Sequence, residues 1–216
     1  MLPQLDIIGI RLLTEHRQAM KVLIFSDIHN DTKRLQELVD TPADTYIAAG
    51  DLVTWSRGLT DCGRILEPLG KRVWVLPGNH ESSEHIERFC QQFGLRNFHE
   101  NVFKVGNYYF GGLGYSNPTP FNTPGEYTEK ELHSKLEKFS GLTPLVLVCH
   151  APPHATKLDQ FDQDSHAGSQ AVRKFIDQEQ PKYFFCGHIH EAAGTIENLG
   201  VTQACNVGKA GYMLEL

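Results

Sequence analysis

Five short apolar segments of this chain each lead, within three residues, into an aspartate, asparagine or histidine. Such runs of four or five residues, bounded by turn-forming residues, are typical of buried strands. Polar side chains at the carboxyl ends of strands in an open α/β sheet gather at one crevice, so the pattern predicts one polar site at a sheet rim. The segments are residues 22–25 before Ser-Asp-Ile-His, 46–49 before Gly-Asp, 73–76 before Pro-Gly-Asn-His, 145–149 before His, and 183–186 before Gly-His-Ile-His.

Helical patterns occupy most of the segments between these strands. Asp31 or Thr32 can cap a helix that continues through Val39, with Leu35 and Leu38 at helical spacing. Strands that alternate with helices indicate an α/β chain. The other expected helices are a weaker one over residues 60–69, one from Ser83 with Phe89 and Phe93 on its apolar face, one from Thr128 with a capping box to Glu131, and one ending near Ile176.

The rest of the chain is hairpin, loop and short strand. Residues 101–112 predict a hairpin that turns at Gly106-Asn107. Residues 115–127 form a loop rich in proline and asparagine, and residues 151–169 form a second polar loop. Residues 194–216 predict several short strands, so the chain becomes β-rich at its end.

Charge and cysteine content narrow the functional classes. The net charge is -6, whereas a protein that binds nucleic acid by neutralising its backbone usually carries the opposite sign, so a nucleic-acid partner is not expected. A phosphate substrate remains compatible, because bound divalent metals can dominate the local charge. The five cysteines form no C-x-x-C pair and predict a reducing compartment rather than a disulfide framework, with Cys149 and Cys186 buried in apolar runs.

The first twenty residues form neither a membrane span nor a signal peptide by their pattern. Their charges at Glu15 and Arg17 follow the apolar part, and no small-residue cleavage site closes it. We therefore expect a cytoplasmic protein without a membrane partner. Because Met20 directly precedes the first strand, we expect residues 1–20 to be an appendage and residues 21–216 to be one domain.

Each polar motif has an ordinary alternative when it is taken alone. Asp27 and His29 could be a helix cap and a surface histidine, Gly50-Asp51 and Gly78-Asn79-His80 could be polar turns, and His150 could be a satisfied core histidine. Two imidazoles in Gly-His-Ile-His at 187–190 are harder to explain without a metal.

The order D-x-H, G-D, G-N-H, H, G-H-x-H resembles that of the calcineurin-like metallophosphoesterase family, over about residues 21–206. The segments at 150–154, 166–177 and 181–195 look most similar to the compact single-domain branch with MPPED-type proteins, which is related to cyclic-nucleotide phosphodiesterases. The resemblance implies a four-layer α/β-β/α sandwich of two mixed sheets flanked by helices, with a metal site at the carboxyl ends of the strands.

The resemblance also implies a role for each motif residue. Two divalent transition metals are expected, with Mn first and Fe, Zn, Co or Ni as options. A metal-activated hydroxide would attack phosphorus, and His80, beside Asn79 and Asp51, would stabilise the phosphate or protonate the leaving oxygen. By this resemblance Asp27, His29 and His190 bind the first metal, Asn79, His150 and His188 bind the second, and Asp51 bridges both.

Three functions fit these residues. Hydrolysis of a phosphodiester in a small substrate, with a nucleotide as one option, is the first; a phosphomonoesterase and a metal-binding scaffold without catalysis are the alternatives. The segment at 50–58 lacks the Asp-Arg pair of the protein phosphatases, and the chain has no length for the capping domain of the related nucleases. Asn30-Asp31 stands where many members have Gly-Asn, and we expect only a changed turn there. The sequence does not indicate an oligomeric state.

Loops over the metal rim should select the substrate. The loops at 115–127 and 151–169 are the candidates; the second carries His154, Asp159, Asp162, Asp164 and His166 and is either a lid or a solvated loop. Trp55 and Arg57 could meet a base and a phosphate, or Trp55 could pack its own loop. Glu191 could orient a ligand histidine or lie at the surface.

Overall fold

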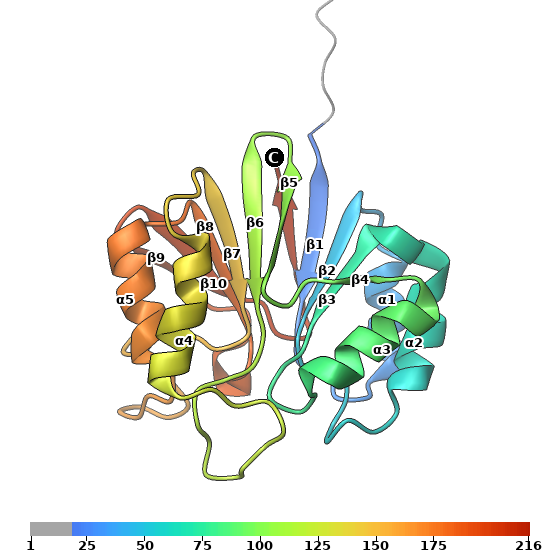
Figure 1. Ribbon diagram of the computed structural model, residues 1–216, viewed down its shortest axis with the longest axis horizontal. Coiled ribbons are helices and arrows are strands. Elements are labelled where there is room, and N and C mark those ends of the chain that lie inside the picture. The colour runs from blue at the N-terminus through green and yellow to red at the C-terminus, as the bar shows by residue number, and fades with distance from the viewer. Residues whose placement is uncertain (1–18) are drawn as a thin grey trace, which may run out of the picture.

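The computed structural model describes residues 19–216 and arranges them as two β-sheets with helices on both outer sides (Figure 1). The first sheet is mixed: its edge strand β11 runs antiparallel to β1, and the other pairs are parallel. In spatial order its strands are β11 (Tyr212–Glu215), β1 (Lys21–Phe25), β2 (Thr45–Ala49), β3 (Val73–Leu76) and β4 (Arg96–Asn97).

The second sheet is also mixed. Its central pairs β6–β7, β7–β8 and β8–β10 are parallel, and both edge strands are antiparallel to their neighbours. The strands are, in spatial order, β5 (Asn101–Val105), β6 (Tyr108–Leu113), β7 (Leu145–Cys149), β8 (Tyr183–Cys186), β10 (Thr202–Asn206) and β9 (Ile196–Leu199). The predicted hairpin over 101–112 is confirmed as β5 and β6.

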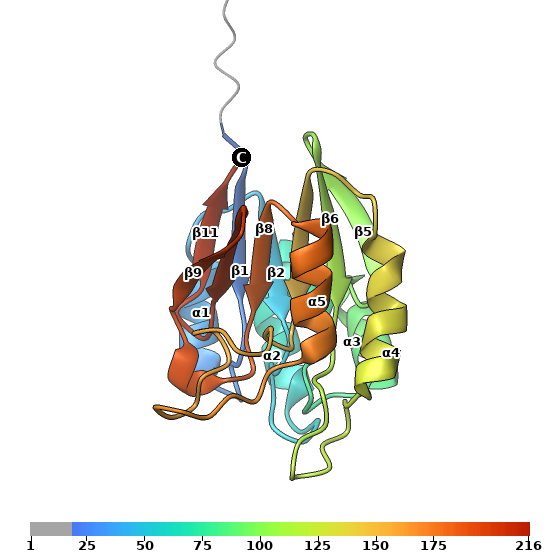
Figure 2. The ribbon, with the colours of Figure 1, turned by 90° about the vertical axis from the view of Figure 1, so that its left-hand side faces the viewer.

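Helices cover the outer face of each sheet, which Figure 2 shows from the side. The first sheet carries α1 (Thr32–Val39), α2 (Leu59–Leu66) and α3 (Ser83–Phe93), and the second carries α4 (Glu129–Leu136) and α5 (Gln170–Glu179). Short 3₁₀ helices lie at Glu67–Arg72 (η1), Glu137–Phe139 (η2) and His190–Ala192 (η3). The predicted four-layer α/β-β/α sandwich is confirmed.

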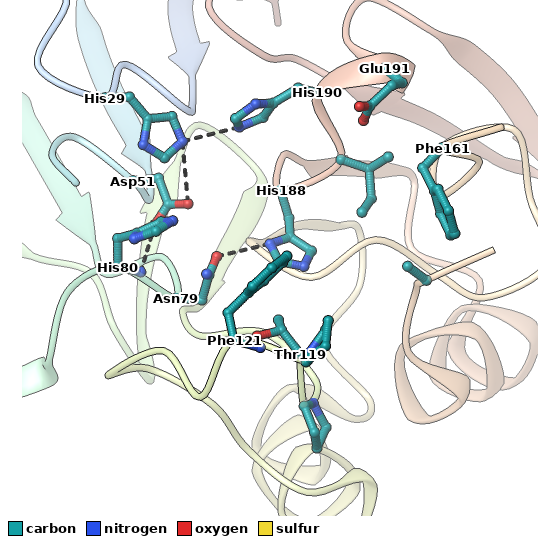
Figure 3. Close-up of a pocket in the computed structure, with 14 residues that line it drawn as sticks. His29, Asp51, Asn79, His80, Thr119, Phe121, Phe161, His188, His190 and Glu191 are labelled. Carbon is teal, nitrogen blue, oxygen red and sulfur yellow. Dashed lines mark hydrogen bonds and ion pairs between the residues drawn. The ribbon is translucent and has the colours of Figure 1, made fainter. Parts of the chain in front are cut away.

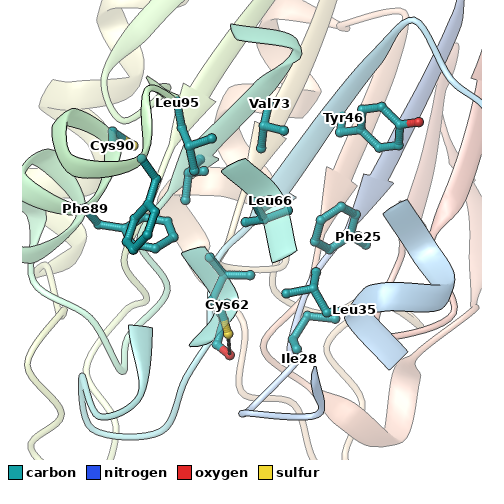
Figure 4. Close-up of a cluster of buried hydrophobic side chains, with 14 of the residues drawn as sticks. Phe25, Ile28, Leu35, Tyr46, Cys62, Leu66, Val73, Phe89, Cys90 and Leu95 are labelled. Carbon is teal, nitrogen blue, oxygen red and sulfur yellow. Dashed lines mark hydrogen bonds between the residues drawn. The ribbon is translucent and has the colours of Figure 1, made fainter. Parts of the chain in front are cut away.

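The alternation of side chains along each central strand divides the core into three layers. In β1, Leu23 and Phe25 point outward to the helices, whereas Val22 and Ile24 point to the other sheet. The outer layer beneath α1–α3 includes Phe25, Leu35 and Leu66 (Figure 4). Each fully buried side chain of this size contributes about 1.5–3 kcal/mol, so both faces of the central strands hold the sheets in place.

The expected helix starts are confirmed by their caps. Thr128 and Glu131 form the predicted capping box, Asp31 accepts from the Arg34 amide, and Ser169 caps α5. The expected helix over 60–69 ends earlier, at Leu66, and continues as η1, which has proline in its first turn. The two-residue strand β4 was not predicted, because two residues carry no periodicity.

Residues 1–18 lie outside the part that the structure describes, so the expected appendage stays a prediction. Met20 exchanges two backbone hydrogen bonds of 3.0 Å with Leu216, beyond the paired ends of β1 and β11. Within residues 19–216 no helix is long and apolar enough to span a membrane. Cys149 and Cys186 are buried, as expected.

Candidate metal centre

The predicted ligands meet at the end of the molecule where the parallel strands of both sheets finish. Figure 3 shows His29, Asp51, Asn79, His188 and His190 of this set close together at the cavity. The first sheet supplies the residues after β1, β2 and β3, and the second sheet supplies those after β7 and β8. Residues up to 163 positions apart in the sequence thereby line one site. These residues are Asp27, His29, Asp51, Asn79, His150, His188 and His190.

The first group of ligand atoms comes from the segments after β1 and β8. Asp27, His29 and His190 each offer one atom, and these atoms lie within 4.8 Å of one another. The two histidines approach through ring nitrogens, with Nε2 of His29 3.0 Å from Nε2 of His190. A carboxylate oxygen of Asp27 lies 3.7 Å from the same nitrogen of His190. Two imidazole nitrogens and a carboxylate oxygen at this spacing could hold one cation.

The second group is centred on the Asn79 side-chain oxygen. This oxygen lies 2.8 Å from Nδ1 of His188 and 3.2 Å from Nε2 of His150. Asp51, His150 and His188 also offer atoms within 4.8 Å of one another. The amide of Asn79 is held by Thr123, whose hydroxyl oxygen accepts from its Nδ2 at 3.2 Å. The amide oxygen is therefore directed at the two rings.

Asp51 lies between the two groups. Its Oδ2 is 3.3 Å from Nε2 of His150 and 3.7 Å from Nε2 of His29. Its Oδ1 accepts a hydrogen bond of 2.9 Å from the backbone N–H of His80. A carboxylate with two oxygens, placed between two sets of donors, can serve both.

Several of these residues have an unusual backbone. The φ angles of Asp27, His29, Asp51 and His188 are 57°, 47°, 52° and 71°. Residues other than glycine pay roughly 1 kcal/mol or more for this left-handed region, so the surrounding packing must hold them there. Strain of this kind concentrates at functional sites.

Glycine in the sequence motifs makes room for the ligands. A Cβ at Gly78 would overlap the carboxylate of Asp51, and one at Gly187 would overlap that of Asp27. The motifs G-N-H and G-H-x-H therefore need glycine because the backbone approaches the carboxylates of Asp51 and Asp27 closely.

The charges in the site favour a bound cation. Burial would raise the pKa of Asp51, but its interactions with His150 and His29 outweigh the effect of burial and hold that pKa below its usual range. Burial would likewise lower the pKa of His150, yet Asp51 and Asp27 raise it to about 9. The carboxylates thus create a strongly negative environment, which a metal can satisfy in place of a proton. Burial lowers the pKa of His188 to about 4 and keeps this ring neutral, as a metal ligand must be.

Glu81 is a residue of the site that the sequence analysis missed. It follows His80 directly, is fully buried, and accepts hydrogen bonds from the backbone N–H groups of Gly78 (2.8 Å), Val53 (2.9 Å) and Asp51 (3.1 Å). It therefore ties the G-D and G-N-H turns together. Burial, and then the charge of Asp51, raise its pKa to about 8. The sequence offers one sign of this role, because Glu81 directly follows an apolar strand and the turn at its end.

Asn30 and Thr54 were also missed. The Asn30 side chain accepts from the Thr54 N–H at 2.9 Å and donates to the Arg57 carbonyl at 2.7 Å. The Thr54 hydroxyl then lies 3.1 Å from Nδ1 of His29, which directs the other ring nitrogen toward His190. The residue at 30 thus does more than change a turn.

A cavity of about 470 Å³ opens over the ligands. Its inner wall includes His29, Asp51, Asn79 and His188, and His80 stands beside them. The ring of Trp55 packs edge-on against His80 at 5.6 Å, whereas Arg57 does not line the cavity. Glu191 is exposed and lines its outer part.

The loop at 151–169 is neither a free lid nor a wholly solvated segment. Asp159 is fully buried and accepts from the N–H groups of Thr156 and Gly168 at 2.9 Å. Nδ1 of His166 lies 2.7 Å from the same carboxylate, while Asp162 and Asp164 are exposed. A buried carboxylate thus holds the loop in one shape.

The model of the calcineurin-like phosphoesterase family matches residues 20–192. The chain belongs to this family. It is also 34% identical over 205 residues to protein MJ1162 of Methanocaldococcus jannaschii, covering 90% of this chain and 91% of that protein. It is 23% identical over 190 residues to a protein of Arcobacter nitrofigilis named "Probable glycerophosphodiester phosphodiesterase GpdQ", covering 82% of this chain and 67% of that one.

Solved structures share the fold. The protein TT1561 of Thermus thermophilus matches with a TM-score of 0.68 and 20% identity, over 88% of this chain and 89% of that one. A dimetal phosphatase from Danio rerio matches with a TM-score of 0.52 and 13% identity, over 87% of this chain and 86% of that one. Membership of this family implies a phosphoric ester hydrolase. The clusters of histidine and aspartate could hold the metals that such an enzyme uses.

Proposed function

We propose that this protein is a dinuclear metal-dependent phosphodiesterase. The observation that carries the proposal is the position of Asp51 between two groups of ligand atoms, because a shared carboxylate is what a pair of neighbouring cations requires. In this proposal Asp27, His29 and His190 hold one ion, Asn79, His150 and His188 hold the other, and Asp51 holds both.

The donor atoms indicate which metals fit. Four imidazoles, two carboxylates and an amide oxygen suit Mn, Fe, Zn, Co or Ni, and suit Ca poorly. We expect Mn to support activity. When bound, two such ions supply Lewis acidity to the phosphate oxygens and a hydroxide nucleophile near neutral pH.

His80 is proposed to act on the phosphate or the leaving oxygen. The backbone N–H of Trp55 donates to its Nδ1 at 3.4 Å, so in the neutral ring the proton sits on Nε2. The side chain lines the cavity, and one of its ring nitrogens lies within 4.8 Å of ligand atoms of His29 and Asp51. We assign it to the substrate because both of those residues already serve the two proposed metal positions. An N–H at that position can donate to a phosphate oxygen or protonate a leaving group.

The diester preference rests on two supports. The cavity, at about 470 Å³, has room for more than a phosphate group alone. The relative of Arcobacter nitrofigilis carries the name of a phosphodiesterase. The same ligands can serve a phosphomonoester, so the comparison of the two substrate classes is the decisive test.

The experiment compares bis-p-nitrophenyl phosphate with p-nitrophenyl phosphate on the Mn-loaded protein, with His80→Ala alongside. We expect faster turnover of the diester, and a loss of at least about tenfold in kcat in the variant with its metal content unchanged. His85→Ala, which alters an exposed histidine on α3, is the control and should match the parent. Preference for the monoester would establish the monoesterase alternative. No turnover with two metals bound would favour a scaffold.

A further inference from the structure

Two exposed phenylalanines, Phe121 and Phe161, lie at the opening of the cavity, and the surface that they form is called the lip. Phe121 is 72% exposed and Phe161 is 45% exposed, and both line the cavity above the ligands (Figure 3). They come from different loops, residues 115–127 and residues 151–169. Pro118 and Pro120 of the first loop, and Ile189 between His188 and His190, add apolar surface to the cavity lining.

The loop that carries Phe121 is held by hydrogen bonds. The carboxylate of Glu126 accepts from the hydroxyls of Thr119 and Thr123, both at 2.6 Å, and from the Thr123 N–H at 2.8 Å. The backbone N–H of Phe121 donates to the Thr119 hydroxyl at 3.2 Å. These bonds hold the loop backbone around Phe121, whose side chain is exposed at the cavity.

The loop that carries Phe161 is joined to the first one. The side chain of Asn117 donates to the carbonyl of Ala167 at 3.0 Å and links the two loops. Buried Asp159 holds its own loop, and the N–H of Phe161 donates to the Ser165 carbonyl at 3.2 Å. Two loops fixed to each other hold the aromatic lip in place before a ligand arrives, which lowers the entropy lost on binding.

The charge of the cavity excludes one large class of ligand. None of its fourteen lining residues is a lysine or arginine, and Glu191 adds a negative charge at its outer part. A second phosphate group away from the metal positions, as in a nucleoside diphosphate, would meet no lysine or arginine among these lining residues. Apolar walls with a few polar groups at the far end suit a ligand that has one anionic end and one apolar end.

We propose that the lip between Phe121 and Phe161 binds an aromatic or apolar group esterified to the phosphate, and that substrates with a second phosphate are disfavoured. As a statement about substrates this rests on the proposed phosphoesterase function. As a statement about binding it requires only that metals bound beside Asp51 and His188 hold the ligand's anionic end. The rings would stack against or pack on the group and exclude water from it.

The test uses two phosphonates that share one anion and differ in the attached group. Binding of phenylphosphonate and of methylphosphonate to the Mn-loaded protein is measured by titration calorimetry. We expect phenylphosphonate to bind at least about fivefold more tightly. That ratio should fall toward one in Phe121→Ala and in Phe161→Ala. Val201→Ala, at a valine that is 74% exposed outside the cavity, is the control and should keep it.

Equal affinities of the parent protein for the two phosphonates would overturn the inference, as would an unchanged ratio in both phenylalanine variants. Turnover of bis-p-nitrophenyl phosphate by the same preparations reports on the proposed function separately. Selective binding of the phenyl compound without turnover would support the apolar binding site and contradict the phosphodiesterase function. Turnover without selective binding would support the phosphodiesterase function and overturn the apolar binding site.

Discussion

Among the side chains that offer no atom to either ligand group, Glu81 is the one whose removal should harm the proposed metal centre most. Glu81→Ala would leave the buried N–H groups of Gly78, Val53 and Asp51 without their acceptor. An unsatisfied buried donor costs at least about 1 kcal/mol, so we expect a loss of about 3 kcal/mol in the free energy of unfolding. The free energy of unfolding of such a domain is roughly 5–15 kcal/mol, so the variant should still fold.

The second expected effect is on the metals. The turn after β2 carries Asp51, and the turn after β3 carries Asn79, so loosening both should lower metal occupancy as well as stability. Glu81→Gln keeps the side-chain volume but turns an amide NH₂ toward at least one of these N–H groups. This variant should lose less stability and less metal than the alanine variant.

Urea unfolding of the metal-free proteins and metal content after dialysis measure both effects. Glu84→Ala is the matched control, since Glu84 is an exposed glutamate on α3 that, among residues 19–216, forms its ion pair with Arg88 one turn away. If Glu81→Ala unfolded within about 0.5 kcal/mol of the parent and kept two metals, the proposed role of Glu81 would be wrong.

Three further perturbations test other parts of the account. Asp51→Asn should weaken binding of both metals because it removes the shared charge, and two full sites by metal analysis would contradict the bridging role. Gly78→Ala should cost about 1–3 kcal/mol in urea unfolding and lower metal content, because the new Cβ overlaps Asp51; unchanged stability would refute the close approach. Burial would raise the pKa of Glu100, but hydrogen bonds from Lys135 and Lys138 outweigh the effect of burial and lower this pKa from 4.5 to about 2. These contacts therefore stabilise the fold above about pH 4.5 and lose their effect as pH falls toward 2. The difference in unfolding free energy between the parent and Glu100→Gln should shrink as the pH is lowered through this range, and a constant difference would count against it.

Most strands, most helices and the meeting of the candidate ligands were predictable because the information is local. An apolar run such as Leu145–Cys149 followed at once by His150 marks both a buried strand and the residue at its end. The rule that carboxyl ends converge then places Asp27 and His150 together, although they come from different sheets. The division of ligands between two metals came from the family resemblance, and the geometry around Asp51 is compatible with it.

The supporting residues could not be predicted because their contacts are not local. Glu81 looks like a surface glutamate until its backbone partners at Asp51 and Val53 are known. Asn30 contacts the loop after β2, which lies more than twenty positions away. The burial of Asp159 depends on its own loop folding back over it, and polar composition alone suggests exposure. Hydrogen bonds of this kind follow from the tertiary fold rather than from periodicity.

The most direct measurement is anomalous X-ray diffraction from crystals of the Mn-loaded protein, recorded on both sides of the Mn absorption edge. We expect two Mn ions per chain. One should lie at the group of Asp27, His29 and His190, the other at the group of Asn79, His150 and His188, and Asp51 should contact both. A single ion, or ions bound away from these residues at saturating Mn, would contradict the dinuclear centre and the proposed chemistry that depends on it.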